Sequence, residues 1–322
     1  MTEPRPHALF SFGTLLDERV QTTLFGGPVP TTPASLAGHT TRPLPITDPD
    51  VIATSGLDVH LTLKRAIGES VQGAVLHLTD ADLAAADAYE VDDYARRRVL
   101  LASGDSASGD SARGDSAWAY LDARPLRPAA RVVIVGDSIA YGRCDPYGGW
   151  AAHLASAHIA ADEAAHRVFN LAIPGSTLAD VAAQTPPLLG PRLPDTLLVA
   201  AGINDSAVPV GGHGPGGDPL ERLPEHLDAL AGAARRHGAR LVVVGPLWLD
   251  ETRTADYEGL RFTEARALRL RALQRDWCAR HHVDHLDLWE PLRGRPELLV
   301  DGLHPTPEGH KELSSHLGAL AG

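Results

Sequence analysis

The sequence predicts two domains, an α+β domain followed by an α/β domain with a parallel sheet. Its 322 residues are too many for a typical single domain and suit two. Near residue 131 the hydrophobic pattern changes from short strands around one helix to a regular alternation of strands and helices. The segment 123–130, ARPLRPAA, contains two prolines, has no periodicity and precedes a new apolar strand. We therefore expect domains over 1–122 and 131–322, joined by a linker over 123–130.

Short strands and a single helix make up the expected first domain. The strands are predicted over 8–12, 71–78, 97–101 and 117–121. Thr79 is followed three positions later by Asp82, a capping-box arrangement with Asp in place of Glu, which starts a helix after the second strand. The near-repeat SGDSASGDSARGDSA at 103–117 has small polar residues that cannot bury enough surface to order a backbone, so we expect a flexible hairpin tip there.

The expected second domain alternates apolar strands with helices. Strands are predicted over 131–135, 167–171, 196–201, 240–245 and 283–287, and helices near 148–159, 177–185, 219–237, 258–281 and 307–319. Continuous apolar strands between helices indicate a parallel sheet covered on both faces. Ligands of such sheets bind beyond the carboxyl ends of the strands, so a functional site is expected on the loops at that edge.

Composition and charge exclude several classes of function. The chain has 29 basic and 41 acidic residues, and its net charge of -12 repels nucleic acid and anionic membrane surfaces. No run of about 18 apolar residues is present that would span a membrane. The N-terminus lacks a basic segment followed by an apolar stretch, and Cys144 and Cys278 are isolated, without metal-ligand spacing. We therefore expect a cytoplasmic protein with reduced thiols, and neither nucleic acid nor a membrane as a partner.

Four motifs in the second domain carry the chemistry. They are GDSIAYG at 136–142, Gly175, GIND at 202–205 and DGLH at 301–304. Gly-Asp-Ser also occurs at 104, 109 and 114, but only the copy at 136 follows an apolar strand. The first three motifs follow the first, second and third strands of the expected sheet, and the fourth precedes the last helix. We therefore expect all four to meet at one edge of the sheet.

These motifs supply a nucleophile, a base and a third group. A serine hydroxyl such as that of Ser138 becomes nucleophilic when a base takes its proton, and the base needs a partner that fixes its tautomer. His304 and Asp301 fit these two roles, and Pro305 holds His304 in an extended conformation at a helix entrance. Three donors are expected for an oxyanion, namely the backbone N–H groups of Ser138 and Gly175 and the side-chain amide of Asn204.

The order and spacing of these four motifs resemble those of the SGNH hydrolase family, also called the GDSL-type esterases, over about 131–320. The resemblance implies a three-layer α/β/α sandwich of flavodoxin-like type, without a metal or another cofactor. It implies hydrolysis or transfer of acyl groups on esters, thioesters and acetylated sugars. It assigns Ser138 as nucleophile, Asp301 and His304 as the rest of the triad, and Gly175 and Asn204 as oxyanion donors. The absence of any G-x-S-x-G argues against the α/β-hydrolase alternative.

Other residues of the second domain have structural interpretations. Asp137 and Asp205 are expected to hold the motif loops rather than to react. Trp150 and Trp248 would either line an acyl pocket or pack in the core. The histidines of the C-terminal region fall into two sets: His310 and His316, expected to be solvated on the last helix, and His281, His282 and His285, expected to be structural beside the fifth strand.

The first domain carries a resemblance of its own. ALFSFGTL at 8–15, Gly73, AADAYE at 85–90 and Tyr94-Ala95-Arg96 resemble the γ-glutamylcyclotransferase-like (AIG2-like) family over about 7–122. The resemblance implies a small α+β barrel whose loop Phe12-Gly13-Thr14-Leu15 binds a γ-glutamyl group through backbone amides, with Glu90 as acid and base. Phe12 replaces the usual Tyr. If the missing hydroxyl contacts the ligand, binding is weakened; if only the ring and the backbone matter, little changes.

The implied reaction needs little protein chemistry. The α-amine of the substrate attacks its own γ-carbonyl and closes a five-membered ring, so positioning supplies most of the acceleration and one carboxyl can shuttle the proton. Glu90 would need a pKa raised by an apolar pocket. The products would be 5-oxoproline and a freed amine. In the alternative interpretation, Glu90 only pairs with Arg96 or Arg97 on a retained scaffold.

Three functions follow from these patterns. The first is a bifunctional enzyme that joins a serine esterase or deacylase to a γ-glutamyl cyclotransferase acting on γ-glutamylamines. The second is a single-activity SGNH esterase or acyltransferase whose first domain recognises substrate without catalysis. The third is a non-catalytic binding protein on two enzyme folds. The acyl group, the leaving group, the choice between hydrolysis and transfer, and the oligomeric state stay open.

Overall fold

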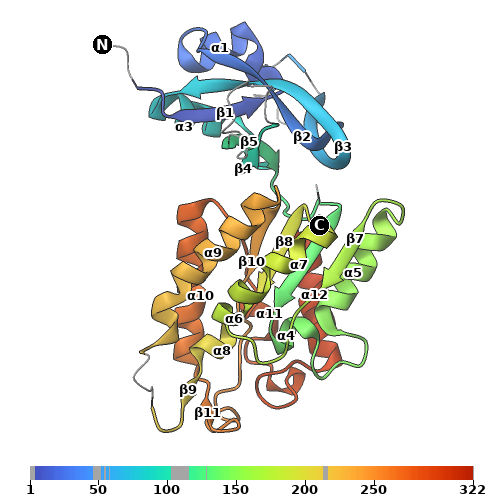
Figure 1. The fold of residues 1–322 in the computed structure, drawn as a ribbon, viewed down its shortest axis with the longest axis vertical. Helices are drawn as coiled ribbons and strands as arrows, with labels where there is room; N and C mark the ends of the chain where they lie inside the picture. The colour runs from blue at the N-terminus through green and yellow to red at the C-terminus, as the bar shows by residue number, and fades with distance from the viewer. Residues whose placement is uncertain are drawn as a thin grey trace. The chain divides into compact units, whose positions relative to one another are not determined.

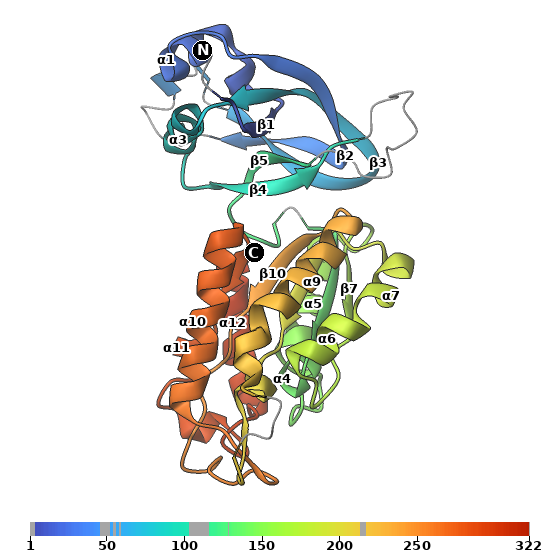
Figure 2. The same cartoon turned by 60° about the vertical axis from the view of Figure 1, so that its left-hand side comes forward.

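The computed structural model describes residues 4–45, 52–53, 56–57, 59–102, 116–127, 129–212 and 217–321. The chain divides into two compact units, Met1–Pro128 and Ala129–Gly322, and this division falls inside the expected linker. Figures 1 and 2 show the ribbon of both units.

The N-terminal unit is built on a mixed five-stranded sheet (Figure 1). Its strands are β1 (His7–Ser11), β2 (Thr31–Pro45), β3 (Val59–Leu78), β4 (Tyr94–Leu100) and β5 (Ser116–Asp122), in the order β2-β3-β1-β5-β4. The pairs β2–β3, β3–β1 and β5–β4 are antiparallel, and β1 is parallel to β5. The predicted α+β class is confirmed. The expected hairpin of β4 and β5 is also present, but its tip at 103–115 lies outside the described residues.

Two apolar clusters lie on opposite faces of this sheet, because neighbouring residues of a strand point in opposite directions. Leu9 belongs to a cluster that includes residues of two helices, α1 (Glu18–Phe25) and α3 (Asp80–Tyr89). Phe10 belongs to a second cluster, which is formed by residues of all five strands without a helix. The two edges of the sheet also approach each other, since the Ala102 N–H, just after β4, donates to the Ser35 carbonyl of β2 at 2.8 Å, which agrees with the predicted small barrel.

The helix predicted after Thr79 is confirmed as α3. The Thr79 side chain accepts from the Asp82 N–H at 3.1 Å, and the Asp82 carboxylate accepts from the Thr79 N–H at 3.0 Å. These two bonds satisfy backbone N–H groups at the helix start that have no partner within the helix. The capping box fixes where α3 begins, and α3 then ends at Tyr89, immediately before Glu90.

The sequence pattern predicted neither β2 nor α1, and it predicted only the last part of β3. β2 contains Pro33 and Pro43, which read as loop residues, but β2 is an edge strand and pairs on one side only, so the missing N–H groups cost little. A bulge between Ala37 and His39 further breaks the alternation. The signals for α1 were present: Asp17 caps its start and Gly26 ends it with a φ of +77°.

The C-terminal unit has a five-stranded parallel sheet, as predicted. Its strands are β6 (Arg131–Gly136), β7 (Arg167–Asn170), β8 (Thr196–Ala200), β10 (Arg240–Val244) and β12 (Asp284–Leu286), in the order β12-β10-β8-β6-β7. Counted from β6, this order is 2-1-3-4-5 read from the opposite edge, which is the flavodoxin-like arrangement. The chain leaves β6 toward β7 on one side and later returns to β8 on the other. The loops after β6 and β8 are therefore neighbours at the switch point.

Helices cover both faces of the parallel sheet and give three layers (Figures 1 and 2). The longer helices are α5 (Gly149–Ala161), α6 (Leu178–Gln184), α9 (Leu223–Arg236), α10 (Glu264–His281) and α12 (Pro307–Ala321). α5 packs against α12 on one face, whereas α6, α9 and α10 contribute to a single apolar cluster on the other. Shorter helices lie in the connections, namely α4 (Ser138–Tyr141), α7 (Pro186–Leu189), α8 (Ile203–Ser206) and α11 (Trp289–Leu292).

Two predicted helices begin later than expected. The helix predicted over 258–281 begins at Glu264, because Thr263 caps it by accepting from the Arg266 N–H. Just before it, Leu260–Arg261 forms the short strand β11, which pairs with β9 (Val208–Pro209). The helix predicted over 219–237 starts with a 3-10 turn before α9. Within the described residues, no helix has both the length and the apolar character required to cross a membrane.

Candidate active site

Ser138 lies at the first position of α4, directly after β6. Gly136 ends the strand where it approaches β8, and a Cβ on Gly136 would lie 2.2 Å from the carbonyl oxygen of Ala200. Asp137 caps α4 by accepting from the Ile139 N–H at 3.0 Å. The strand, the close approach and the cap together present the Ser138 hydroxyl at the carboxyl edge of the sheet.

The structure brings three of the predicted site residues into one chain of hydrogen bonds. Ser138 Oγ lies 2.8 Å from His304 Nε2, although the two residues are 166 positions apart. His304 Nδ1 lies 2.8 Å from Asp301 Oδ2. The His304 side chain is 2 % exposed, so water does not compete for these bonds. The backbone around it is fixed on both sides, since the Val300 N–H donates to the His304 carbonyl at 2.8 Å and Leu299 bridges to Pro305.

The Asp301 carboxylate accepts four hydrogen bonds. Oδ1 accepts from the backbone N–H groups of Leu303 at 3.0 Å and His304 at 2.8 Å. Oδ2 accepts from His304 Nδ1 at 2.8 Å and from the hydroxyl of Tyr257 at 2.9 Å. Burial alone would raise the pKa of Asp301, but the bonds from His304 and Leu303 hold it well below its usual range. Asp301 is therefore an anion at neutral pH and fixes the proton of His304 on Nδ1.

Tyr257 was missed by the sequence analysis. It lies in the connection between β10 and β11, where no hydrophobic period and no motif marks it. Its ring packs edge-on against Phe262 and at a tilt beside His304, with ring centroids 6.0 Å apart in each case. Burial and the bond to Asp301 raise the pKa of Tyr257 to about 12, so its hydroxyl keeps its proton and acts as a donor.

Gly175 lies in the connection after β7, and Asn204 lies in the short helix α8 after β8. Asn204 Nδ2 donates to the carbonyl of Ser176, the residue after Gly175, at 2.9 Å. An amide NH2 group has two protons, so this bond leaves one available to a ligand. Gly175 has a φ of +82°, and no atom lies within 4 Å of the position that its Cβ would take. The loop is thus open at Gly175 and is held in place by Asn204.

Asp137 and Asp205 bond backbone N–H groups, as the loop-holding interpretation requires. Asp205 accepts from the Leu178 N–H at 2.8 Å, which ties α8 to the start of α6. Burial raises the pKa of Asp137 to about 7 and that of Asp205 to about 6. Neither carboxyl has a hydrogen bond to Ser138 Oγ or His304 in the described part of the chain.

The expectation that His310 is solvated is wrong, whereas His316 is partly exposed. His310 is fully buried, its Nδ1 accepts from the Trp150 N–H at 3.2 Å, and its Nε2 lies 3.1 Å from the Arg143 carbonyl. It shares the inner face of α12 with two fully buried residues, Leu313 and Leu317. His316 Nε2 lies 3.0 Å from the carbonyl of Asp287. His310 thus joins α12 to the loop that follows the nucleophile helix.

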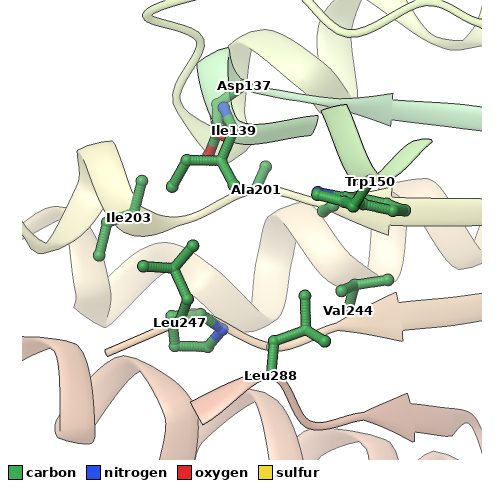
Figure 3. A pocket seen from close by; sticks show the side chains of 11 residues that line it. Asp137, Ile139, Trp150, Ala201, Ile203, Val244, Leu247 and Leu288 are labelled. Carbon is green, nitrogen blue, oxygen red and sulfur yellow. Dashed lines mark hydrogen bonds between the residues drawn. The ribbon is translucent and has the colours of Figure 1, made fainter. Parts of the chain in front are cut away.

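A small pocket lies near the carboxyl ends of β6, β8 and β10 (Figure 3). Its lining includes Asp137 and Ile139, the neighbours of Ser138, and Trp150, Ile203, Leu247 and Leu288. It has about 30 Å³ of free space, which is room for about two water molecules. Trp150 lines it but is fully buried, and it packs in the core of the unit.

In the N-terminal unit, the loop Phe12-Gly13-Thr14-Leu15 lies beside the end of α3. Tyr89 Oη lies 3.5 Å from Thr14 Oγ1, which places the loop next to the residue preceding Glu90. Leu15 is buried in the cluster under α1 and α3, and the Phe12 ring stacks on Phe10 with centroids 6.3 Å apart. Gly13 is exposed, and a Cβ there would meet no atom within 4 Å.

Within the described part of the chain, the carboxyl group of Glu90 lacks the hydrogen bonds that the carboxyl groups of Asp137, Asp205 and Asp301 accept. Glu90 is half-buried, and no described residue donates a hydrogen bond or an ion pair to its carboxyl group. Burial raises its pKa from 4.5 to about 7. Arg96, one of the two suggested partners, instead pairs with Asp87 at 2.8 Å. Burial raises the pKa of Tyr94 and of Tyr120, and the charge of Glu90 adds to both shifts.

The chain matches two family models in the order in which the sequence predicted them. Residues 134–312 match the model of the GDSL-like lipase/acylhydrolase family, and residues 9–135 match that of the AIG2-like gamma-glutamyl cyclotransferases. No match was found among curated proteins.

Similar solved structures cover the C-terminal part of the fold. A lipase/acylhydrolase from Enterococcus faecalis is 22% identical over 59% of this chain and 97% of its own, with a TM-score of 0.47. A catalytic mutant of an acetylxylan esterase from Geobacillus stearothermophilus is 15% identical over 60% of this chain and 94% of its own, with a TM-score of 0.46.

Proposed function

We propose that this chain, which belongs to the GDSL-like lipase/acylhydrolase family and carries an AIG2-like domain before it, is a serine acyl hydrolase with a second, cyclotransferase site. The single observation that supports the hydrolase is the unbroken chain from Ser138 Oγ through His304 to Asp301, with 2.8 Å at each step. The substrates are small acyl esters and, at the N-terminal site, γ-glutamylamines. The protein acts in the cytoplasm.

The hydrolase reaction starts with proton transfer. His304 Nε2 takes the proton of Ser138 Oγ, which attacks the ester carbonyl, and Asp301 stabilises the imidazolium through Nδ1–H. The tetrahedral intermediate breaks its bond to the leaving oxygen, which receives the proton from His304. An acyl-serine remains. Water then attacks it, with His304 as base once more, and the acid and the free serine are released.

The negative oxygen of each tetrahedral intermediate is stabilised by three donors. These are the backbone N–H of Ser138, the backbone N–H of Gly175 and the second Nδ2 proton of Asn204. Two observations support this assignment: the open surroundings of Gly175 and the bond from Asn204 to Ser176, which ties α8 to the loop that contains Gly175. Donors held in place before the reaction need no reorganisation as charge develops.

Ser138→Ala tests the hydrolase. We expect the rate on a short-chain aryl ester to fall by about 10⁴- to 10⁶-fold, because the nucleophile is gone and only binding and the oxyanion donors remain. A fluorophosphonate probe should add its mass to the wild-type protein and not to the variant. Equal labelling of both proteins, or no labelling of the wild type, would contradict the assignment and would favour a binding protein on an enzyme fold.

The proposed cyclotransferase uses Glu90. With a pKa of about 7, this carboxyl exchanges a proton readily at neutral pH. It takes a proton from the α-amine as that nitrogen attacks the γ-carbonyl, and it then protonates the leaving nitrogen as the amide bond breaks. The products are 5-oxoproline and the amine. The loop from Phe12 to Leu15 holds the γ-glutamyl group beside Glu90.

The two sites are tested against each other with Ser138→Ala and Glu90→Gln, each assayed on an aryl ester and on a γ-glutamylamine. Independent sites require that each variant loses one activity and keeps the other. If the N-terminal domain only recognises substrate, neither the wild type nor Glu90→Gln forms 5-oxoproline, and Glu90→Gln changes only the KM for the ester. Loss of both activities in one variant contradicts two separate sites.

A further inference from the structure

Tyr257 reaches the triad from an element that carries none of the four motifs. It lies between β10 and β11, and its hydroxyl donates to Asp301 Oδ2 at 2.9 Å. The same oxygen accepts His304 Nδ1–H at 2.8 Å. Tyr257 Oη is 3.5 Å from His304 Nδ1, which is too long for a good hydrogen bond, so its direct partner is the carboxylate.

Two donors on one oxygen compete for its negative charge. A hydrogen bond from the phenol stabilises the free carboxylate and therefore reduces how much that carboxylate gains when His304 becomes an imidazolium. The same bond also fixes the position of Oδ2, since the two backbone bonds act on Oδ1. Removal of the hydroxyl would therefore have two separable effects, a more basic imidazole and a less well-held carboxylate.

We infer that Tyr257 is a positioning residue of the triad, whose hydroxyl holds the Asp301 carboxylate against His304 and limits the basicity of the imidazole. The inference rests on the proposed hydrolase function for its catalytic meaning. The geometry that supports it is one phenol, one carboxylate oxygen and one imidazole within hydrogen-bond reach, with the Tyr257 ring held by Phe262 and His304.

Other charged and titratable groups act on the same cluster. Besides the effect of burial, the charge of Arg143 lowers the pKa of Tyr257 and the charge of Glu258 raises it. The charge of Asp301 adds to the burial that raises the pKa of Cys144, and the charge of His304 adds to the burial that lowers the pKa of His310. None of these groups is changed by Tyr257→Phe, which also keeps the aromatic ring. A change in the titration of His304 in this variant is therefore due to the lost hydroxyl.

The test is the titration of the His304 imidazole, followed by NMR in the wild type and in Tyr257→Phe, with Ser138 intact in both. We expect the midpoint in the variant to rise by about half to one pH unit, which corresponds to part of a hydrogen bond to a charged group. The acid limb of kcat/KM on an aryl ester should move upward by the same amount. Tyr147→Phe is the control, because Tyr147 is 78% exposed and should leave the midpoint unchanged.

An unchanged or lower midpoint in Tyr257→Phe would overturn the inference, even if activity falls, because a structural role alone lowers the rate without moving the titration. The NMR measurement needs no substrate. It therefore still decides the role of Tyr257 if the wild type proves unable to hydrolyse esters, a result that would contradict the proposed function instead.

Discussion

The two candidate sites use ionisable groups in opposite ways. In the C-terminal unit, the Asp301 carboxylate accepts four hydrogen bonds, and its pKa lies well below the usual range. In the N-terminal unit, the Glu90 carboxyl has no hydrogen-bond donor among the described residues, and burial raises its pKa to about 7. One carboxyl is kept as a permanent anion, and the other is kept ready to exchange a proton.

This difference fits the two proposed reactions. A serine needs a base of fixed tautomer and an anion that never takes the proton itself. Ring closure by the substrate's own amine needs only a group that accepts and returns one proton. The C-terminal site therefore depends on several hydrogen bonds that exist before the substrate binds. The N-terminal site depends on the polarity around the single side chain of Glu90. Substitutions in the two sites should consequently differ in size and in pH dependence.

The largest effect is expected for Asp301→Asn. An amide nitrogen in place of one oxygen would face the donors of His304 and Tyr257 and would favour the wrong imidazole tautomer, so kcat/KM on an aryl ester should fall by about 10³- to 10⁴-fold. Asp276→Asn, at an exposed position of α10, is the matched control. A fall of less than tenfold would show that the four hydrogen bonds of Asp301 contribute little to catalysis.

A smaller loss is expected for Asn204→Ala. The variant removes one proposed oxyanion donor and the bond to Ser176, so kcat should fall by about 10²- to 10³-fold. Steady-state kinetics on the same ester would measure it. KM should change little, because the donor acts mainly on the charged intermediate. An increase in KM at constant kcat would instead assign Asn204 to substrate binding.

Substitution of one glycine at a strand contact in each unit allows the stabilities of the two units to be compared. A Cβ on Gly136 would lie 2.2 Å from the Ala200 carbonyl, and one on Gly73 would lie 2.2 Å from the Ser11 carbonyl. Gly136→Ala and Gly73→Ala should each destabilise their own unit by about 1–3 kcal/mol through overpacking. Hydrogen exchange read by mass spectrometry reports each unit separately. Gly190→Ala, with a helical φ of -51° and no atom within 4 Å, should have little effect.

The smallest effect is expected for Glu90→Gln, which should change how the free energy of unfolding of the N-terminal unit depends on pH. The folded pKa of about 7 exceeds the ordinary 4.5, so the folded state binds more protons between these values and its stability falls as pH rises through that window. The neutral variant lacks this loss and should be more stable than the wild type by about 1–2 kcal/mol above pH 7, which is less than the ~3 kcal/mol that the full shift would give, because solvent screens the half-buried Glu90. Glu69→Gln, at an exposed position, is the control. Parallel pH profiles for wild type and Glu90→Gln would refute the raised pKa.

Prediction from sequence succeeded where one physical signal dominates. The strands of the parallel sheet are buried on both faces and read as continuous apolar runs, of which Val132–Val135 is an example. Ser138, His304 and Asp301 come together because each stands next to a strand end or a helix start that the pattern also reveals. By contrast, β2 combines an edge position with prolines and a bulge, so its sequence does not alternate.

The missed features depend on contacts that local sequence does not encode. Tyr257 has its partner 44 positions away and lies in a connection without periodicity. His310 is polar and was expected to be exposed, but it lies three positions before Leu313 on the buried face of α12. This helical spacing from a buried leucine indicates that His310 is buried as well. A polar residue in an apolar stripe of a helix is better interpreted as a buried residue with partners than as an exposed one.

The bonds of His310 set a limit on the acidity that the C-terminal unit tolerates. Nδ1 can accept from Trp150 only while it carries no proton, so the arrangement exists only for the neutral ring with its hydrogen on Nε2. Burial lowers the pKa of His310, which keeps the ring neutral below the ordinary titration point of 6.5. At lower pH, His310 Nδ1 would gain a proton and become a donor that faces the Trp150 N–H, which is also a donor. At a pH low enough to protonate His310, the segment after α4 would then detach from α12 before the parallel sheet unfolds.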